Sequence, residues 1–313
     1  MNITEPDLKK PAPKVLFTHV INPFTPRAES HDVAQKVTFK AIENAIEFAR
    51  QNGVSVEALG VALQADAHVI APPIKPVISL NRTMMDFGTF TKKRAYPLFG
   101  DVLRAAAEHG CGEYLIYTNI DISPQRNCYV ETKRLIDAQG NANPMHPFII
   151  TRRSLLTRPY ASVDELEEMY KDPGSPHPGY DYFVFPRAWV EKMRFAAVCI
   201  GAWWFDLVLM ANLDTLSQKR TLVYKDLYLT FHVGDDPQWT GLDDEFALHN
   251  AREAAKAAKE LRESTGVKPF ASWLDWLEIK LAGSRPKVRR ALIEWRNHRQ
   301  KKAIARRSGT RDY

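Results

Sequence analysis

The sequence has few cysteines and no hydrophobic run long enough to cross a bilayer. Its three cysteines, Cys111, Cys128 and Cys199, form an odd and widely spaced set. Such a set predicts neither a disulfide framework nor a cysteine-based zinc site, and it favours a reducing compartment. The most apolar window, residues 195–211, is shorter than a membrane span and contains Asp206, so we interpret it as core.

The N-terminal residues lack the apolar segment of a secretory signal. Residues 1–13 are polar and interrupted by prolines, which predicts a disordered lead-in. We therefore expect a cytoplasmic protein whose membrane contact is limited to the periphery of the inner face.

Positive charge is concentrated at the C-terminal end of the chain. Between residues 284 and 313, eleven lysines and arginines stand against two acidic residues, whereas the net charge of the whole chain is +6. This basic tail can form an amphipathic helix with Val288, Leu292 and Trp295 on its apolar side, suited to an anionic membrane surface. The alternative is a solvated cationic tail. No nucleic-acid partner is expected, because the tail carries no recognised nucleic-acid module.

The first part of the chain alternates between apolar strands and amphipathic helices. Hydrophobic residues make up 45% of the chain, enough for one large α/β domain. Strands are predicted at residues 14–21, 56–63, 77–80 and 113–120, and helices at 31–52 and 97–109. This order predicts a mostly parallel mixed sheet flanked by helices, with ligands beyond the carboxyl ends of the strands. The polar residues at these ends are Thr18, His19, Asn22, Asp66, Asn119 and Asp121.

The second half has a less regular pattern. Strands are predicted at 148–151, at 182–185 and within 222–233, and helices at 243–264 and 270–282. A short helix is expected after Ser162, whose spacing to Glu165 is that of a capping box. We divide the chain into the lead-in (1–13), an α/β domain (14–240, with halves 14–122 and 123–240), a C-terminal helical extension (241–283) and the basic tail (284–313).

The segment Asn119-Ile120-Asp121 ends a predicted buried strand. Its first and third side chains point the same way from an extended backbone. A carboxylate at the end of a rigid strand can hold Mg²⁺ or Mn²⁺, whose other ligands come from water and a diphosphate. Asp121 can bind such a metal directly, whereas Asn119 can offer a neutral oxygen, or bind a ribose or a metal-bound water. The alternative is that both residues only form the turn after the strand.

The segment from Tyr114 to Ile122 resembles the strand that carries the Asp-X-Asp element of GT-A-fold glycosyltransferases, with asparagine at its first position. The basic loop 92–94 and the helix after it are similar to the elements that lead into that strand. The likeness covers roughly residues 14–240. It implies a single GT-A-like, Rossmann-related domain that moves a sugar from a nucleotide-diphosphate-sugar donor to a hydroxyl of a glycan or lipid-linked acceptor, assisted by Mn²⁺ or Mg²⁺.

The resemblance also implies roles for residues of the second half. Asp206, which adjoins Trp203 and Trp204, is the first choice for the base that removes the acceptor proton, and Asp181 is the second. Trp203 is expected to stack on a sugar face, with core packing as the alternative for either tryptophan. Arg187 is expected to contact the acceptor or a phosphate, with a solvated position as the alternative.

The same family often uses a late histidine near the diphosphate as a further metal ligand, and His232 resembles it. The alternative is a strand-end histidine bonded to the backbone. Arg94 and its lysine neighbours are expected to stabilise the diphosphate. The other residues expected to bind the nucleotide sugar are Thr18, His19, Asn22, Asp66 and Asn119.

Two other functions stay open on the sequence alone. A sugar-1-phosphate nucleotidyltransferase shares the sheet topology, but it usually has a glycine-rich loop after the first strand, where residues 22–27 contain no glycine. A non-catalytic carbohydrate-binding scaffold of the same fold is the other alternative, and the asparagine at position 119 supports it.

Overall fold

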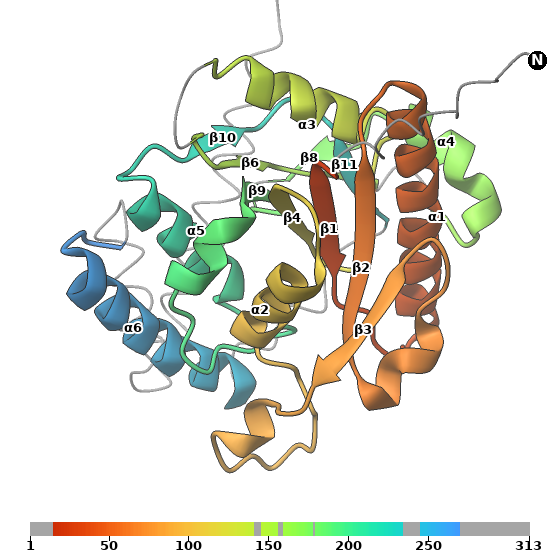
Figure 1. The fold of residues 1–313 in the computed structure, drawn as a ribbon. Helices are drawn as coiled ribbons and strands as arrows, with labels where there is room; N and C mark the ends of the chain where they lie inside the picture. Colours follow the sequence, from red (N-terminus) through yellow and green to blue (C-terminus); the bar gives the residue numbers. More distant parts are fainter. Residues whose placement is uncertain (1–14, 141–144, 156–158, 178, 234–244, 270–313) are drawn as a thin grey trace, which may run out of the picture.

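The computed structural model describes residues 15–140, 145–155, 159–177, 179–233 and 245–269. Within them, a seven-stranded sheet has the strand order β10-β6-β9-β4-β1-β2-β3 (Figure 1). Its strands are β1 (Phe17–Ile21), β2 (Val56–Leu63), β3 (Lys75–Leu80), β4 (Tyr114–Thr118), β6 (Phe148–Ile150), β9 (Tyr182–Pro186) and β10 (Leu222–Tyr224). β9 runs antiparallel to β4 and β6, and the other pairs are parallel, so the mostly parallel mixed sheet is confirmed.

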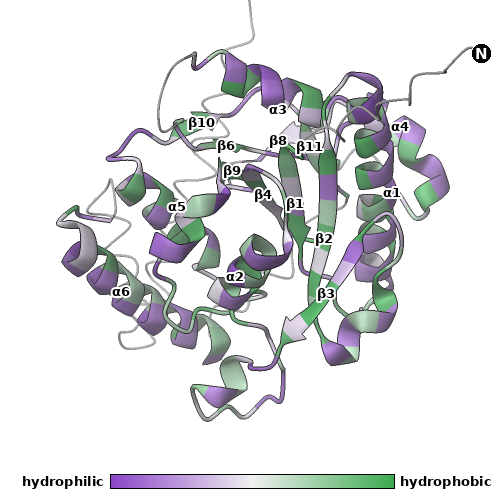
Figure 2. Cartoon of the chain, viewed as in Figure 1, coloured by the Kyte–Doolittle hydropathy of each residue, from purple (hydrophilic) through white to green (hydrophobic). Residues whose placement is uncertain are grey.

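Helices cover both faces of this sheet. Their bounds are α1 (Glu29–Gln51), α2 (Phe99–His109), α3 (Cys128–Asp137), α5 (Phe205–Leu216) and α6 (Glu245–Thr265). Successive side chains of β4 point to opposite faces. Leu115 and Tyr117 therefore join a buried cluster with α2, α5 and α6, whereas Ile116 joins one with α1 and α3. Figure 2 shows hydrophobic residues along the central strands and polar residues on the outward sides of α1 and α6.

Helix α1 ends where the sequence predicts. Its last helical residue is Gln51, and Gly53 follows with a φ of +74°. Glycine adopts this left-handed conformation without steric cost, which makes it the usual residue just after a helix. The helix begins at Glu29, two residues before the predicted start at His31. Its first turn therefore lies nearer to the end of β1 than expected.

A second, four-stranded sheet within the described residues packs against α1 and α4 (Leu166–Lys171). Its strand order is β5 (Ile122–Pro124), β11 (Thr230–Val233), β7 (Arg153–Leu155) and β8 (Ser175–Pro176). The predicted strand 113–120 ends early, because the chain turns at Asn119 before entering β5. The strand-rich stretch 222–233 divides between the two sheets, with β10 in the large one and β11 in the small one.

The capping box predicted at Ser162 can be checked against hydrogen bonds. The Ser162 side chain accepts from the N–H of Asp164, and the Glu165 carboxylate accepts from the N–H of Ser162. This capping box starts a short 3₁₀ helix that continues into α4. A further 3₁₀ helix, Arg187–Lys192, follows Pro186.

Helix α6 confirms the helix predicted over 243–264, but it belongs to the core. Ala251, Ala254 and Ala257 lie in the same buried cluster as Leu209 and Leu213 of α5. The sequence assigned this helix to an extension beyond residue 240. Its packing instead makes it part of the layer that covers the sheet.

Some predictions fall outside the described residues. These are the lead-in at 1–13, the helix at 270–282 and the basic tail at 284–313. Among the described helices, none combines the length and the apolar character that a membrane span requires.

Candidate functional site

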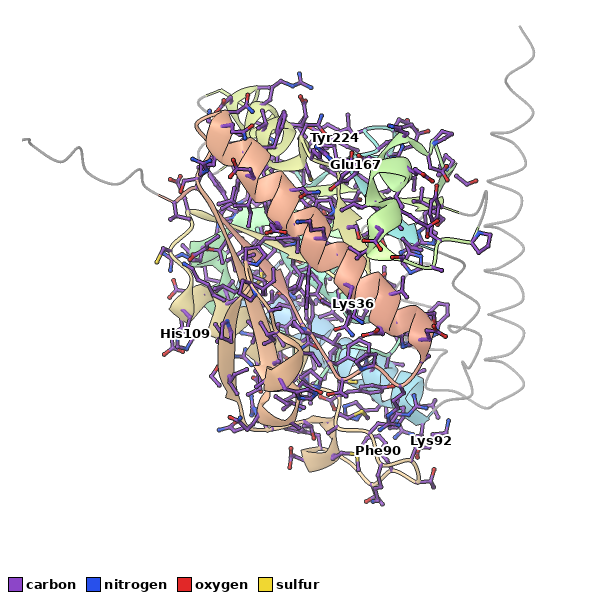
Figure 3. All side chains as sticks on the ribbon, turned by 90° about the vertical axis from the view of Figure 1, so that its right-hand side faces the viewer. Lys36, Phe90, Lys92, His109, Glu167 and Tyr224 are labelled. Atoms are coloured by element: carbon purple, nitrogen blue, oxygen red, sulfur yellow. The ribbon has the colours of Figure 1, made fainter. Side chains whose placement is uncertain are left out.

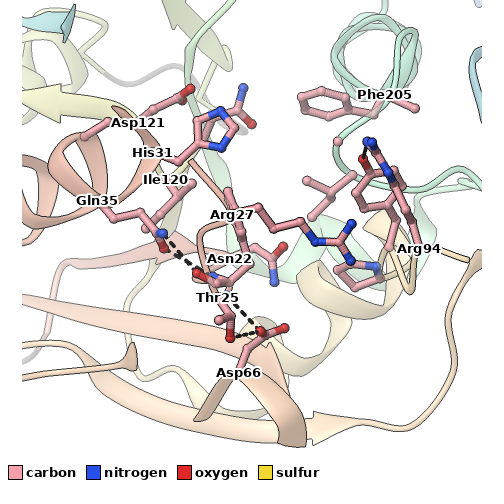
Figure 4. A pocket seen from close by; sticks show the side chains of 18 of the residues that line it. Asn22, Thr25, Arg27, His31, Gln35, Asp66, Arg94, Ile120, Asp121 and Phe205 are labelled. Carbon is pink, nitrogen blue, oxygen red and sulfur yellow. Dashed lines mark hydrogen bonds between the residues drawn. The ribbon is translucent and has the colours of Figure 1, made fainter. Parts of the chain in front are cut away.

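A cavity of about 810 Å³ lies beyond the carboxyl ends of β1, β2 and β4 (Figure 4). This is the edge at which parallel α/β sheets bind their ligands. The predicted site residues that line it are Asn22, Asp66, Arg94, Asn119, Asp121, Trp203 and His232. The fold therefore brings together candidates from both halves of the sequence.

Asp121 and His232 are neighbours because of strand pairing. Asp121 directly precedes β5, and β11 pairs with β5 so that His232 stands opposite Ile122. His232 Nε2 and Asp121 Oδ2 are 3.4 Å apart. Burial favours a higher pKa for Asp121, but the hydrogen bond and charge of His232 outweigh it and hold this pKa below its ordinary value. Asp121 is therefore ionised at neutral pH, as a metal ligand must be.

Asn119 is arranged as a hydrogen-bond donor toward the cavity. The Tyr117 hydroxyl donates to Asn119 Oδ1 at 3.2 Å. Burial first, and then the charges of Asp121 and Asp206, raise the pKa of Tyr117, so its hydroxyl keeps its proton. This bond uses one lone pair of the amide oxygen, and the two N–H groups of Asn119 can donate to a ligand. The side chain can therefore donate to an anion, and its oxygen keeps a second lone pair for another partner.

Asp121 and His232 offer one carboxylate and one imidazole to a divalent metal. Mn²⁺ accepts both ligand types, whereas Mg²⁺ prefers oxygen. Nowhere in the described part of the chain do three or more histidine, cysteine or acidic side chains gather as a metal site. The pair therefore fits a metal that takes most of its ligands from water and a diphosphate.

The loop between β1 and α1 is anchored by polar side chains (Figure 4). Asn22 Nδ2 donates to a backbone carbonyl of β2 at 2.7 Å. Asp66 Oδ1 accepts from the backbone N–H and the hydroxyl of Thr25, at 2.8 and 2.7 Å. Gln35 of α1 bonds to both the N–H and the carbonyl of Phe24. Asn22 and Asp66, predicted as ligand contacts, thus shape the cavity wall through bonds within the protein.

Arg27 and His31, which were not predicted as site residues, line the cavity from this loop and from the first turn of α1. The ring of His31 packs edge-on against Phe24, with centroids 5.8 Å apart. Both residues come after the first strand, at the edge of the sheet where ligands bind. This position could have identified them as candidate ligand contacts, but the predicted helix began too late in the sequence to indicate it.

Arg94 forms part of the opposite wall. Its Nη1 donates to the Tyr96 hydroxyl at 2.8 Å, and its guanidinium lies 6.0 Å from the centroid of the Phe246 ring of α6. A cation over an aromatic face is attracted to it, so both contacts orient the side chain. Lys92 and Lys93 are exposed and do not line the cavity. Of the predicted basic loop, Arg94 is the residue placed to meet a ligand.

The two adjacent tryptophans have different environments. Trp203 lines the cavity, whereas Trp204 is buried in the core. Asp206 lies in the first turn of α5, as predicted. It does not line the cavity itself, but its charge acts on Tyr117, which does.

Thr18 and His19 lie inside β1 rather than at its carboxyl end, and both are 0% exposed. The Thr18 hydroxyl donates to Glu57 Oε1 at 2.7 Å. His19 bonds to the hydroxyls of Tyr129 and Thr118, at 2.7 and 2.9 Å. The structure thus buries these two predicted nucleotide-sugar contacts inside β1, where the protein itself satisfies their polar groups.

Asp181 is buried and forms an ion pair with Arg152, which is equally buried. His177 Nδ1 lies 3.6 Å from the Asp181 carboxylate. Burial favours a higher pKa for Asp181, but the charge of Arg152 and the hydrogen bond from His177 hold it well below its ordinary value. Asp181, predicted as the alternative base, thus engages a buried arginine and is not among the residues that line the cavity.

Arg187 lies at the opposite edge of the sheet from the cavity. It follows β9, which is antiparallel and therefore ends beside the amino end of β4. Its Nε donates to the carbonyl of Gly112 and its Nη1 to that of Ala107, at 2.7 and 2.8 Å. Arg187, predicted to contact a ligand, thus ties β9 to the last turn of α2 and to the loop after it.

No protein-family model and no curated protein matches the sequence. Among solved structures, S. aureus TarS in complex with UDP-GlcNAc is similar, with a TM-score of 0.47 and 10% identity over 87% of this chain and 74% of that chain. Glucosyl-3-phosphoglycerate synthase from Mycobacterium tuberculosis, in complex with Mn²⁺, UDP-glucose and phosphoglyceric acid, has a TM-score of 0.42 and 11% identity over 81% and 80%. The catalytic domain of Drosophila β1,4-galactosyltransferase 7, in complex with xylobiose, has a TM-score of 0.35 and 9% identity over 71% and 72%.

Proposed function

We propose that the chain is a glycosyltransferase that moves a sugar from a nucleotide-diphosphate-sugar donor to a hydroxyl acceptor. The observation that carries this proposal is the pairing of Asp121 with His232 at the end of β4, in a cavity that also presents Arg94 and Trp203. The cavity volume of about 810 Å³ lies in the usual range for a small-molecule site.

Asp121 and His232 would hold the divalent metal, which, when bound, stabilises the negative charge of the leaving diphosphate. Arg94 adds a fixed positive charge in the same cavity, where that negative charge develops. The N–H groups of Asn119 would donate to an oxygen of the phosphates or the ribose. Together these residues would bind the leaving group more strongly as the glycosidic bond breaks.

Asp206 would act as the base. It would take the proton of the acceptor hydroxyl as the oxygen attacks the anomeric carbon and the bond to the diphosphate breaks. Its place in the first turn of α5, three residues after the cavity-lining Trp203, supports this role. Trp203 would face the sugar, because aromatic rings pack well against the C–H face of a pyranose.

The acceptor, a glycan or a lipid-linked molecule, is proposed from the sequence alone. We also propose from the sequence alone that the protein is cytoplasmic and contacts the inner face of the membrane peripherally through the basic tail. A vesicle co-sedimentation assay with anionic and neutral lipids would test that contact. Binding that is equal on both lipids, or absent on both, would contradict it.

The proposed function is tested by a binding and turnover screen. Calorimetry with ADP, GDP, UDP, CDP and TDP, with and without Mn²⁺, should identify one diphosphate. The protein should bind this diphosphate more tightly in the presence of Mn²⁺ than in its absence. The matching nucleotide sugars should then release that diphosphate in the presence of a glycan or polyprenyl acceptor mixture. Absence of nucleotide binding across the panel would contradict the proposal.

A non-catalytic carbohydrate-binding protein is the second candidate. The asparagine at position 119 favours it, because it leaves Asp121 as the only carboxylate of the Asn119-Ile120-Asp121 segment. Tight sugar or nucleotide-sugar binding without turnover of any donor would support this candidate. Pyrophosphorolysis of a nucleotide sugar to a nucleoside triphosphate would instead indicate a nucleotidyltransferase.

A further inference from the structure

Arg27 is a cation of the cavity to which no role has been assigned. It follows β1 by six residues, lines the cavity and is exposed. Its guanidinium has no hydrogen-bond or ion-pair partner among the described residues. A guanidinium carries five N–H donors in a planar fork that suits phosphate oxygens. A ligand can therefore take up all of its donors.

The backbone that carries Arg27 is held in place. Two residues before it, Thr25 donates twice to Asp66, and Phe24 is bonded through both of its backbone polar groups to Gln35. Gln35 is 4% exposed, so this anchor is buried in the protein. The loop thus presents the Arg27 side chain from a fixed base, which reduces the entropy lost when a ligand binds.

Arg27 shares the cavity with a second arginine. Figure 4 shows its side chain reaching across the cavity toward the side on which Arg94 lies. Arg94 is itself oriented by Tyr96 and by the ring of Phe246. Two like charges in one concave site repel each other unless an anion lies between them. The site is therefore charged for an anionic ligand.

The carboxylates of the cavity do not provide that anion. Asp66 uses Oδ1 for two bonds from Thr25, and Asp121 lies beside His232. Neither forms an ion pair with Arg27. The N–H groups of Asn119 also suit an anionic ligand. They are hydrogen-bond donors at a position where a carboxylate would have repelled phosphate.

We propose that Arg27 is a diphosphate-binding residue, which acts with Arg94 and Asn119 so that part of the nucleotide affinity does not depend on a metal. This inference rests on the proposed function, since it assigns the anion to the donor. The fixed cations would neutralise part of the negative charge of the phosphates. A second carboxylate at position 119 would instead have held the metal more firmly and left this task to the metal.

Calorimetry in EDTA tests the inference, with UDP and GDP as probes and uridine and guanosine as their uncharged counterparts. For the diphosphate that binds, Arg27→Gln should weaken affinity about 10- to 100-fold, the value of one charge-assisted hydrogen-bond pair. Arg27→Lys should recover part of this loss, because it restores the charge without the fork. The nucleoside should bind equally to all variants.

Lys36→Gln is the matched control. Lys36 lies on the outward face of α1 (Figure 3), where its side chain is 63% exposed and paired with Asp32. This variant removes one positive charge from α1, the helix that follows the Arg27 loop, outside the cavity, and should keep diphosphate affinity within about twofold. The thermal unfolding of each variant without ligand should match that of the wild type, since both positions are exposed.

The outcomes separate the inference from the function on which it rests. Diphosphate affinity of Arg27→Gln equal to that of Lys36→Gln overturns the role of Arg27 and leaves the proposed function standing. An equal loss for diphosphate and nucleoside also overturns it, because that would place Arg27 at the base or ribose. A wild-type protein that binds no diphosphate, with Mn²⁺ or in EDTA, overturns both.

Discussion

Asp121 carries the most direct prediction at the scale of single residues. Asp121→Ala should remove the gain in diphosphate affinity that Mn²⁺ provides, by about tenfold or more, because one charged ligand is lost. Calorimetry with and without Mn²⁺ measures this gain. Asp137→Ala removes an exposed carboxylate paired with Lys133 and is the matched control. A Mn²⁺ effect that survives in Asp121→Ala would show that the metal binds elsewhere.

Asp206 should affect the chemical step rather than binding. Asp206→Asn keeps the shape of the side chain but cannot accept a proton, so kcat should fall by about 10²- to 10⁴-fold. The dissociation constant of the donor nucleotide should stay close to that of the wild type, because Asp206 does not line the cavity. Steady-state kinetics combined with calorimetry would measure both. Unchanged kcat would remove Asp206 from the mechanism.

His19 should make the fold sensitive to acid. Burial lowers its pKa to about 3, whereas an unfolded histidine titrates near 6.5. As the pH falls, the unfolded state therefore binds a proton before the folded state does. The contribution of neutral His19 to the free energy of unfolding is fully present above pH 6.5 and is lost as the pH falls toward 3. The loss approaches about 1.4 kcal/mol per pH unit in that window.

Urea unfolding of wild type and His19→Asn at several pH values would measure the effect of His19. The variant lacks the titrating group, so its stability should change less between pH 6.5 and 4 than that of the wild type. Parallel pH profiles for the two proteins would contradict the expected low pKa.

Single residues differ in how far the sequence could predict them. Asp121 follows a recognisable apolar run, so its place beyond the carboxyl end of a strand could be inferred locally, whereas His232 was predicted from the family resemblance. The roles of Thr18 and His19 could not be predicted. The sequence pattern of a polar residue near a strand end is the same whether its side chain faces a ligand or a buried partner. The partner of His19, Tyr129, is distant in the sequence.

At the scale of elements, α6 fixes the segment that carries Trp203. Asn250 of α6 is 0% exposed, and its side chain bonds to Cys199 through both the N–H and the carbonyl and to the carbonyl of Trp203. Asn250→Ala would leave these buried backbone groups without partners. Unfolding in urea should show a loss of about 1–3 kcal/mol or more, since each unsatisfied group costs about that much.

Lys259→Ala is the control on the same helix. Lys259 is 75% exposed and pairs with Glu263 on the surface, so its loss should stay within about 0.5 kcal/mol. Equal stability of the two variants would show that α6 does not hold the Trp203 segment in solution.

The bounds of an element were predictable where one continuous run of residues contains both its hydrophobic pattern and the polar residues that end it. The bounds of β2 agree with the prediction at both ends, because an apolar run is followed directly by polar residues. The division of 222–233 into β10 and β11 was not predictable. Both are short apolar strands, and the choice of sheet depends on pairing with β6 and β7, far along the chain.

At the scale of the whole molecule, the predicted boundary at residue 240 has a testable consequence. A chain that ends there would lack α6, whose Ala251, Ala254 and Ala257 fill the cluster over the sheet. It should expose that apolar surface and lose cooperative unfolding, measured by circular dichroism in urea against the full chain. A cooperative transition at the same urea concentration would support the boundary instead.

Helix α6 also holds two walls of the cavity at once. Glu245 accepts from the N–H groups of Thr91 and Lys92, next to Arg94, and Asn250 binds the Trp203 segment. During synthesis on the ribosome, residues 15–122 emerge long before this helix does. Because nascent chains fold from the N-terminal side, strands β1 to β4 can pair early while the cavity stays open. A ligand that requires both walls would then meet only completed molecules, and unfinished chains would not compete for it.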